Sequence, residues 1–566
     1  MTVTKTIKII SWLFILLPVG IFFAVFSRFT VNAPINDDFS AILAFINNYI
    51  STPSFAGKIK LLLEQANEHR IVYDRIWTII SYKIFHTINF NFLSLVGNLS
   101  LVGIAILYFN RFRSLGKPLY LFIPVTVLLF NFASWENITF AMAGLSNFTV
   151  FLFILLSLHY LTSGKANNKM SLLLSVLFFS LALFTQGGAL SLVPVSIFIL
   201  VYKKEYKNLW IYLALMVLLL GVYFYDYHSP QHNGSIMDTL RELKGRTVLF
   251  VFSFLGNALN YFLIYTSNQQ ESLGITAIAG FCFFALFLYI TKTKYYQRNL
   301  FNYSIMLLIV FSACLTALTR SSFGWDFAGS SRYRINGIIF LISLYFWFLE
   351  TYRVDKKKTS AIILTLTGLY FIGINLNHYE YLGIREQQTN FGIVGYNSGK
   401  PDLLNGDKNQ IELYTKILRQ SDSLNTYHLP SNADLASYYP YGIRQQTPVV
   451  KDEPKLEMPF SVREIYQLAD DYFIDGFAFI KGYSANNQKV YVGFKNEEDK
   501  EPVFYSSKQI ARYDLNPYFN KFTLKNGGYQ ARIHATDIKP GENTIWLMVS
   551  VNGKVKLAET DKKITK

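Results

Sequence analysis

The residues best suited to acid–base and phosphate chemistry gather in four short polar segments, each beside a long apolar stretch. The first contains two adjacent carboxylates, Asp37 and Asp38, and the fourth contains three arginines, Arg320, Arg332 and Arg334. Adjacent carboxylates repel each other, so one of them can titrate high and act as a general base. Guanidinium groups bind phosphate oxygens bidentately, so the arginine segment predicts a phosphate or pyrophosphate site.

The other two segments contribute mixed charges. Residues 67–77 place Glu68, His69 and Arg70 before a stretch, 71–88, whose isoleucines recur at helical spacing. That spacing predicts a helix in the membrane interface whose charged start holds a lipid headgroup. In the third segment, residues 134–140, Glu136 stands between two apolar runs.

Each segment also has a structural interpretation. The acidic pair can be a solvated loop with a helix N-cap, and the charges of 67–77 can pair with one another. Glu136 and Trp135 can anchor the membrane interface, as aromatic belts do. The arginines can pair with Asp326 and stiffen their own loop.

The elements that must position these residues are membrane spans. Of the 566 residues, 51% are hydrophobic and only 16% are charged, and the mean hydropathy is +0.25. The apolar residues form long uninterrupted runs, and runs of about 20 such residues are typical of bilayer-spanning helices. This composition excludes a soluble enzyme, a disordered chain and a disulfide-stapled domain, and it predicts a polytopic α-helical membrane protein.

The distribution of Lys and Arg predicts the topology. Basic clusters follow the second, fourth and sixth apolar runs and precede two later ones, and all fall on the cytoplasmic side if residues 247–266 do not cross. The prediction is about 11 spans, with the N-terminus cytoplasmic, the C-terminus extracytoplasmic, and 247–266 re-entrant or interfacial. The expected runs are 7–25, 92–109, 119–133, 143–162, 170–185, 188–202, 208–225, 273–290, 302–319, 335–352 and 359–376.

After Asn377 the sequence becomes turn-rich, and short alternating segments begin near Ile474. Asn-Gly pairs at 526–527 and 552–553 stand where hairpins would turn. We therefore expect a transmembrane domain over 1–379, a mixed extracytoplasmic connector over 380–460 and a small extracytoplasmic β-sandwich over 461–566.

Several classes of site and partner receive no support. The two cysteines, Cys282 and Cys314, lie inside apolar runs, so neither a disulfide framework nor a clustered metal site is expected. The net charge of +16 fits loops held against anionic lipid. No basic stripe with interleaved aromatic residues stands outside the membrane runs, so nucleic acid is not an expected partner.

The order of these features resembles the GT-C superfamily of membrane glycosyltransferases. The resembling features are the first span followed by an acidic pair, the interfacial helix, the many spans and the extracytoplasmic C-terminal domain. The motif Ser-Ser-Arg-Tyr before a late span, with an arginine ending the preceding span, is similar to uncharacterised and O-antigen-modifying bacterial members. The resemblance covers about the first 380 residues, and its motifs are short.

The resemblance implies an enzyme of the bacterial cytoplasmic membrane. Such enzymes move a sugar from a polyprenyl-phosphate donor to a glycan or lipid acceptor of the cell envelope, usually with inversion. Asp37 matches the acidic position that serves as base or orients the acceptor, and Asp38 matches its partner. The residues that would hold the donor or its phosphate are Arg320, Arg332, Arg334, His69, Arg70 and Glu136.

Elementary chemistry agrees with these roles. A carboxylate that removes the acceptor proton makes the hydroxyl a better nucleophile, and fixed arginines stabilise the departing phosphate. Because arginines supply the positive charge, no metal or other cofactor is required. Two other classes stay open: a transporter or flippase of lipid-linked glycans, and a non-catalytic scaffold that displays a glycan-binding sandwich.

Overall fold

A computed structural model describes residues 3–163, 168–228, 244–260, 269–352, 354, 357–401, 404, 407–431, 440–445, 452–468, 470–510, 512 and 526–566. The chain divides into two compact units. The first comprises residues 1–386 and 413–428, and the second comprises 387–412 and 429–566. The residues expected to form a connector, 380–460, are therefore shared between the two units.

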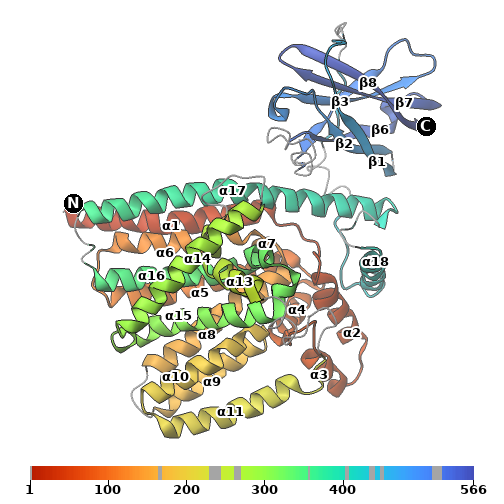
Figure 1. Ribbon diagram of the computed structural model, residues 1–566. Coiled ribbons are helices and arrows are strands. Elements are labelled where there is room, and N and C mark those ends of the chain that lie inside the picture. The colour runs from red at the N-terminus through yellow and green to blue at the C-terminus, as the bar shows by residue number, and fades with distance from the viewer. Residues whose placement is uncertain are drawn as a thin grey trace. The chain divides into compact units, whose positions relative to one another are not determined.

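The first unit is a helical bundle (Figure 1). Within the described residues, nine helices are long and apolar enough to cross a membrane. The helices of the bundle are α1 (Val3–Phe29), α5 (Phe90–Arg113), α6 (Ile123–Leu129), α7 (Trp135–Thr139), α8 (Ala141–Ser163), α9 (Lys169–Leu183), α10 (Leu192–Tyr202), α11 (Tyr206–Phe224), α13 (Lys244–Gly256), α14 (Gln269–Lys292), α15 (Leu300–Arg320), α16 (Arg334–Thr351) and α17 (Lys357–Asn397).

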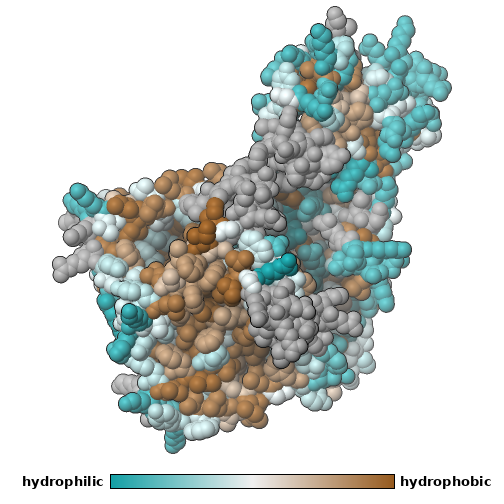
Figure 2. All heavy atoms as spheres, viewed as in Figure 1, coloured by the Kyte–Doolittle hydropathy of each residue, from teal (hydrophilic) through white to brown (hydrophobic). Residues whose placement is uncertain are grey.

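The outer surface of the bundle is apolar. Figure 2 shows a broad hydrophobic surface over these helices, and large side chains such as Leu173, Val217 and Leu218 are exposed. In water such a surface would cost about 25 cal/mol for each Å². The chain is therefore a multi-pass membrane protein with the lipid bilayer as its partner.

The basic connections lie together at one end of the bundle. Arg111 and Arg113 end α5, Lys292 ends α14, and Lys357 begins α17. In Figure 1 these helix ends lie on the same side as the N-terminus, whereas α1 and α15 reach the four polar segments at the opposite end. The helices thus separate the basic loops from the candidate site.

Helix α13 lies along the connection between α15 and α16. At its start, the Thr247 hydroxyl lies 3.2 Å from that of Ser321, and just after its end, Asn257 donates to the carbonyls of Ala328 and Ser330 at 2.9 and 3.1 Å. Both ends of the helix therefore contact one connection, as a re-entrant or interfacial segment does. Residues 261–266 of the expected 247–266 stretch lie outside the described residues.

Smaller helices lie between α1 and α5 in the sequence, and the last of them, α4, begins within the second polar segment. These are α2 (Phe45–Ser51), α3 (Phe55–Leu63) and α4 (Val72–Phe85), and α18 (Lys408–Ser423) contributes its second half to the same unit. The polar side chains of α4, Asp74, Thr78 and Ser81, are buried, while Ile76 and Ile84 are exposed. Its apolar face therefore points outward, which suits a helix bordering lipid.

Helix α17 is longer than the expected run over 359–376. It continues to Asn397 although the sequence after Asn377 includes Gly383, Gly392 and Gly395, and no proline interrupts these added turns. The boundary between the two units falls within this helix, after Glu386.

The second unit contains two antiparallel four-stranded sheets, with strand orders β1-β2-β6-β5 and β4-β3-β7-β8. Buried side chains of both sheets, including Ile474, Ile533, Val492 and Leu547, form one hydrophobic cluster. The strands are β1 (Phe460–Leu468), β2 (Asp471–Ala478), β3 (Lys489–Asn496), β4 (Val503–Ser506), β5 (Lys508–Ile510), β6 (Gly528–His534), β7 (Glu542–Val551) and β8 (Lys554–Thr565).

The two Asn-Gly pairs have different outcomes. Asn552 and Gly553 have φ angles of 49° and 77° and connect β7 directly to β8, so the hairpin expected at 552–553 is confirmed. Most of the connection that precedes Asn526 and Gly527, residues 513–525, lies outside the described residues.

Close packing of α5 on α8 depends on two glycines, which gives the first prediction. A Cβ added at Gly97 would lie 2.5 Å from the carbonyl carbon of Gly144. We expect Gly97→Ala to lower the free energy of unfolding in detergent by about 1–3 kcal/mol, the usual cost of overpacking. Gly20→Ala is the control, because no atom lies within 4 Å of a Cβ there. Equal thermal stability of the two variants would contradict this account.

The separation of the bundle ends gives a second prediction. With Cys282 and Cys314 replaced by serine, single cysteines at the exposed positions Ser40 and Ser322 should react with an impermeant maleimide from one side of the membrane. Cysteines at the exposed positions Ser114 and Lys294 should react only after permeabilisation from the other side. Labelling of Ser40 and Ser322 from opposite sides would show that the polar segments do not share a face.

Candidate functional site

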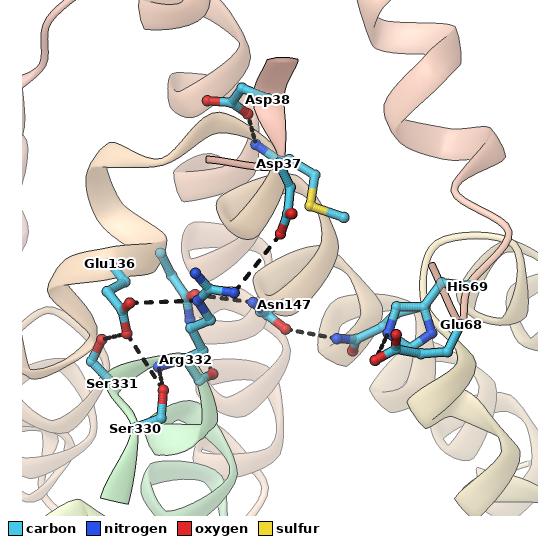
Figure 3. Close-up of polar contacts among 12 residues, drawn as sticks. Asp37, Asp38, Glu68, His69, Glu136, Asn147, Ser330, Ser331 and Arg332 are labelled. Atoms are coloured by element: carbon cyan, nitrogen blue, oxygen red, sulfur yellow. Dashed lines mark hydrogen bonds and ion pairs between the residues drawn. The ribbon is translucent and has the colours of Figure 1, made fainter. Parts of the chain in front are cut away.

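The centre of the candidate site is an arginine between two carboxylates (Figure 3). The Arg332 guanidinium lies 3.9 Å from an Asp37 oxygen and 3.5 Å from a Glu136 oxygen. The Asp37 side chain is 41% exposed and that of Arg332 is 35% exposed. The structure therefore brings together a residue from each of three predicted segments, and Asp37 keeps an accessible carboxylate.

Asp38 has a different environment from its neighbour. It is 1% exposed, and its two oxygens accept hydrogen bonds from the backbone N–H groups of Ile35 and Met142 at 3.1 and 2.9 Å. Met142 lies in the first turn of α8, where N–H groups lack helical partners, so Asp38 ties the loop after α1 to that helix. Asn36, just before the pair, has a φ angle of 47°, and Figure 3 shows the Asp37 and Asp38 side chains pointing in different directions.

Burial raises the pKa of Asp38 to about 8, although the two backbone N–H groups oppose this shift. Asp74, also buried and hydrogen-bonded by Ser146 at 3.1 Å, has its pKa raised well above its usual value, again by burial. These two carboxyls hold the local structure, and Asp37 is the carboxylate of this group with an open side.

Glu136 receives several donors. The Ser331 hydroxyl donates to it, Ser330 donates at 3.4 Å, and Arg385 lies 3.9 Å away. The Arg385 guanidinium also lies 5.2 Å from the centre of the Trp135 ring. Serines and arginines thus fix the Glu136 carboxylate, which in turn orients Arg332.

A second charged group lies beside the first. Glu68 forms an ion pair with Arg320, and the Nε2 atom of His69 lies 3.7 Å from the same carboxylate. Nδ1 of His69 accepts from the backbone N–H of Gly187 at 3.4 Å. Burial lowers the pKa of His69 to about 4, so this imidazole is neutral at pH 7.

Three amide side chains connect the two groups. Asn137 donates to the Arg332 carbonyl at 3.2 Å, Asn147 donates to Asn137 at 3.0 Å, and Gln186 donates to Asn147 at 2.7 Å. Gln186 precedes Gly187, the partner of His69. This chain fixes the spacing of the two charged groups across α7, α8 and the end of α9.

A pocket of about 320 Å³ opens beside two of these amides, Asn147 and Gln186. Its polar end is lined by Glu68, His69, Gln186 and Arg320. The rest of its lining mixes hydroxyl and amide groups, such as those of Ser312, Thr316 and Asn336, with apolar side chains. The apolar side chains include Val150, Phe151, Ile154, Leu190, Phe254 and Leu315. A ligand with an anionic head and an apolar tail fits both parts of such a pocket.

Two of the predicted arginines are enclosed by protein groups. Arg334 is 1% exposed and bonds to the carbonyl of Ala133 at 2.8 Å, to Asn257 at 3.2 Å and to His378 at 2.5 Å. Arg70 donates to the Tyr223 carbonyl at 2.5 Å and to two further carbonyls. These side chains brace the loops that carry Arg332 and His69, and neither borders the pocket. Arg320 and Arg332 do not follow the Asp326 pairing considered above, since they pair with Glu68, Asp37 and Glu136.

The sequence did not indicate Arg385, Asn147 or Gln186 as site residues. Arg385 lies past the expected end of the last span, and the two amides stand within or beside apolar runs. A polar side chain beside an otherwise apolar membrane helix was the available signal for each. Among the described residues, no group of three His, Cys, Asp or Glu side chains is arranged to hold a metal ion.

The raised pKa of Asp38 gives a third prediction. A carboxyl whose pKa rises on folding makes the folded state bind more protons, so its contribution to stability falls as pH increases from about 4 to about 8. Asp38→Asn removes this titration. The melting temperature of the variant, relative to the unaltered protein, should therefore rise between pH 5 and pH 8.5 in detergent.

The control for this prediction is Asp326→Asn, which changes an exposed carboxylate on the arginine loop. Its melting temperature should keep a constant offset from that of the unaltered protein. A constant offset for Asp38→Asn as well would show that Asp38 is ionised in the folded state throughout this range.

Comparison with known proteins assigns no family to this arrangement. No protein-family model matches the chain, and neither a curated protein nor a solved structure is significantly similar to it. The case for a function therefore depends on the geometry of the site.

Proposed function

We propose that this chain is a membrane glycosyltransferase that moves a sugar from a polyprenyl-phosphate donor to a cell-envelope glycan or lipid. The observation that carries the proposal is an accessible carboxylate, Asp37, paired with Arg332 near a pocket whose lining joins Arg320 to apolar side chains. The donor has the same two-part chemistry, a phosphate followed by an isoprenoid chain.

Asp37 is the proposed base. It has the open side that Asp38 lacks, and an ionised carboxylate can accept the proton of an acceptor hydroxyl as that oxygen attacks the anomeric carbon. The bond between the sugar and the phosphate breaks on the opposite face, so the configuration inverts. The departing polyprenyl phosphate leaves as an anion and needs no proton, so one carboxylate is enough.

Arg320 is the proposed partner of the donor phosphate, because it borders the pocket whose apolar walls would receive the isoprenoid chain. Neutral His69 supplies a hydrogen bond there without adding charge. Arg332 lies near Asp37 and Glu136, where its guanidinium stabilises negative charge on either carboxylate.

The proposal includes a topology. The nine long helices, together with the shorter α9 and α10, give eleven crossings, and α13 stays on the face of the polar segments. That face is the extracytoplasmic side of a bacterial cytoplasmic membrane if the basic connections are cytoplasmic. The C-terminal sheets would then form an extracytoplasmic β-sandwich.

The fourth prediction tests the base. Purified full-length protein in proteoliposomes would receive a polyprenyl-phosphate-linked sugar and cell-envelope lipids and glycans, and the polyprenyl phosphate released would be measured by mass spectrometry. Asp37→Asn should lower the turnover rate by about 10²- to 10⁴-fold, the usual contribution of a general base, and leave donor binding almost unchanged. Asp326→Asn should keep full turnover.

Arg320→Gln separates binding from proton transfer. It should weaken binding of polyprenyl phosphate by about tenfold or more, since it removes a charge-assisted hydrogen bond. Full turnover by Asp37→Asn would remove the base assignment. Movement of the intact donor across the bilayer without cleavage would identify a transporter instead.

A further inference from the structure

A second polar pocket is lined by residues of the basic connections, among them Arg111 in the last turn of α5 and Arg298 just before α15. Its volume is about 660 Å³, and it is bordered by the ends of α5, α8 and α16 and the start of α15. The lining includes three cationic side chains, Arg111, Lys117 and Arg298, and one carboxylate, Glu350.

Glu350 is already engaged by neighbouring groups. Asn299 donates to it at 2.6 Å, Tyr295 donates at 3.0 Å, and the Arg298 side chain lies 3.9 Å away and donates to its backbone carbonyl. Three cations and one carboxylate give the lining a positive formal charge, which favours an anionic occupant.

Arg111 is held rigidly in the wall of this pocket. Its guanidinium lies 4.4 Å from the centre of the Phe301 ring and hydrogen-bonds to His159 at 2.9 Å and to Ser163 at 2.6 Å. None of these partners carries a negative charge, so they position the cation without neutralising it. A pre-positioned guanidinium loses little entropy when it binds a phosphate.

The neighbouring pocket has a different character. This Trp12 pocket has a volume of about 610 Å³ and shares Lys117 with the Arg111 pocket. Its wall includes the aromatic side chains of Trp12, Phe109 and Tyr120. Trp12 and Phe109 pack with their ring centres 5.3 Å apart. Lys8 and Arg113 lie at the same site. Aromatic residues beside basic ones are typical of the membrane interface, where headgroups meet acyl chains.

We infer that these two pockets bind one anionic phospholipid at the basic end of the bundle. The phosphate of its headgroup lies among Arg111, Lys117 and Arg298, and an acyl chain lies along the aromatic wall beyond Lys117. A phospholipid fits the two linings better than a soluble phosphate compound, because a ligand without an acyl chain would leave the apolar wall of the Trp12 pocket uncovered. This inference does not depend on the proposed glycosyl transfer.

The test measures lipid binding to the full-length protein in detergent by native mass spectrometry, with phosphatidylglycerol as the probe. Phosphatidylglycerol should bind at least about tenfold more tightly than phosphatidylcholine, and its affinity should fall as salt increases. Lys117→Gln should weaken phosphatidylglycerol binding by about fivefold or more, and Arg111→Gln with Lys117→Gln should weaken it further. Lys204→Gln, on the connection from α10 to α11, and Lys207→Gln, in the first turn of α11, change residues outside both linings and should leave the affinity unchanged.

Two further arms identify the source of the phosphate. Glycerol phosphate and inorganic phosphate at the same concentration should bind far more weakly than phosphatidylglycerol. If either binds equally well, the ligand is a soluble phosphate compound and the inference fails. Equal binding of phosphatidylcholine, or equal loss in Lys117→Gln and Lys204→Gln, would also overturn it. Lys117→Gln should not alter polyprenyl phosphate binding, so this result stands apart from the test of Arg320.

Discussion

An arginine at the end of an apolar helix bundle must find acceptors, because an unpaired guanidinium removed from water costs several kcal/mol. The connection from α15 to α16 is organised by this constraint. Arg334 bonds to carbonyls and to His378, Arg320 pairs with Glu68, and Arg332 lies between Asp37 and Glu136. These contacts bring together segments that are as much as 295 residues apart in the sequence (332 − 37). The candidate site exists where those contacts converge.

The multi-pass helical class was predictable from composition and hydropathy alone, and the structure confirms it. The distribution of Lys and Arg predicted that the basic connections lie together at one end of the bundle. The Asn-Gly pair at 552–553 predicted the hairpin between β7 and β8. The extent of α17 was not predictable in the same way, because membrane-span patterns end where hydropathy falls, whereas the helix continues through polar residues.

Within the site, sequence could identify the segments but could not rank the residues inside them. Asp37 and Asp38 are adjacent and chemically identical. What distinguishes Asp38 is its burial and a hydrogen bond from the backbone N–H of Met142, which is 104 residues away in the sequence. The same holds for Arg332 and Arg334, which are separated by burial. No pattern in the sequence indicates that Arg385, in α17, lies 3.9 Å from Glu136. This contact depends on how α17 packs in the folded bundle.

The charged cluster has a consequence for selectivity. Arg320, Arg332 and Arg385 face Glu68, Asp37 and Glu136, so three cations are balanced by three anions when no ligand is present. In the proposed function, the donor phosphate displaces a carboxylate from its arginine, so binding is an ion exchange among charges that are already paired. Small inorganic anions gain little from such an exchange, whereas an amphiphile also gains the free energy of transferring its tail into the apolar pocket. The resting balance therefore discriminates against anions that bring charge alone.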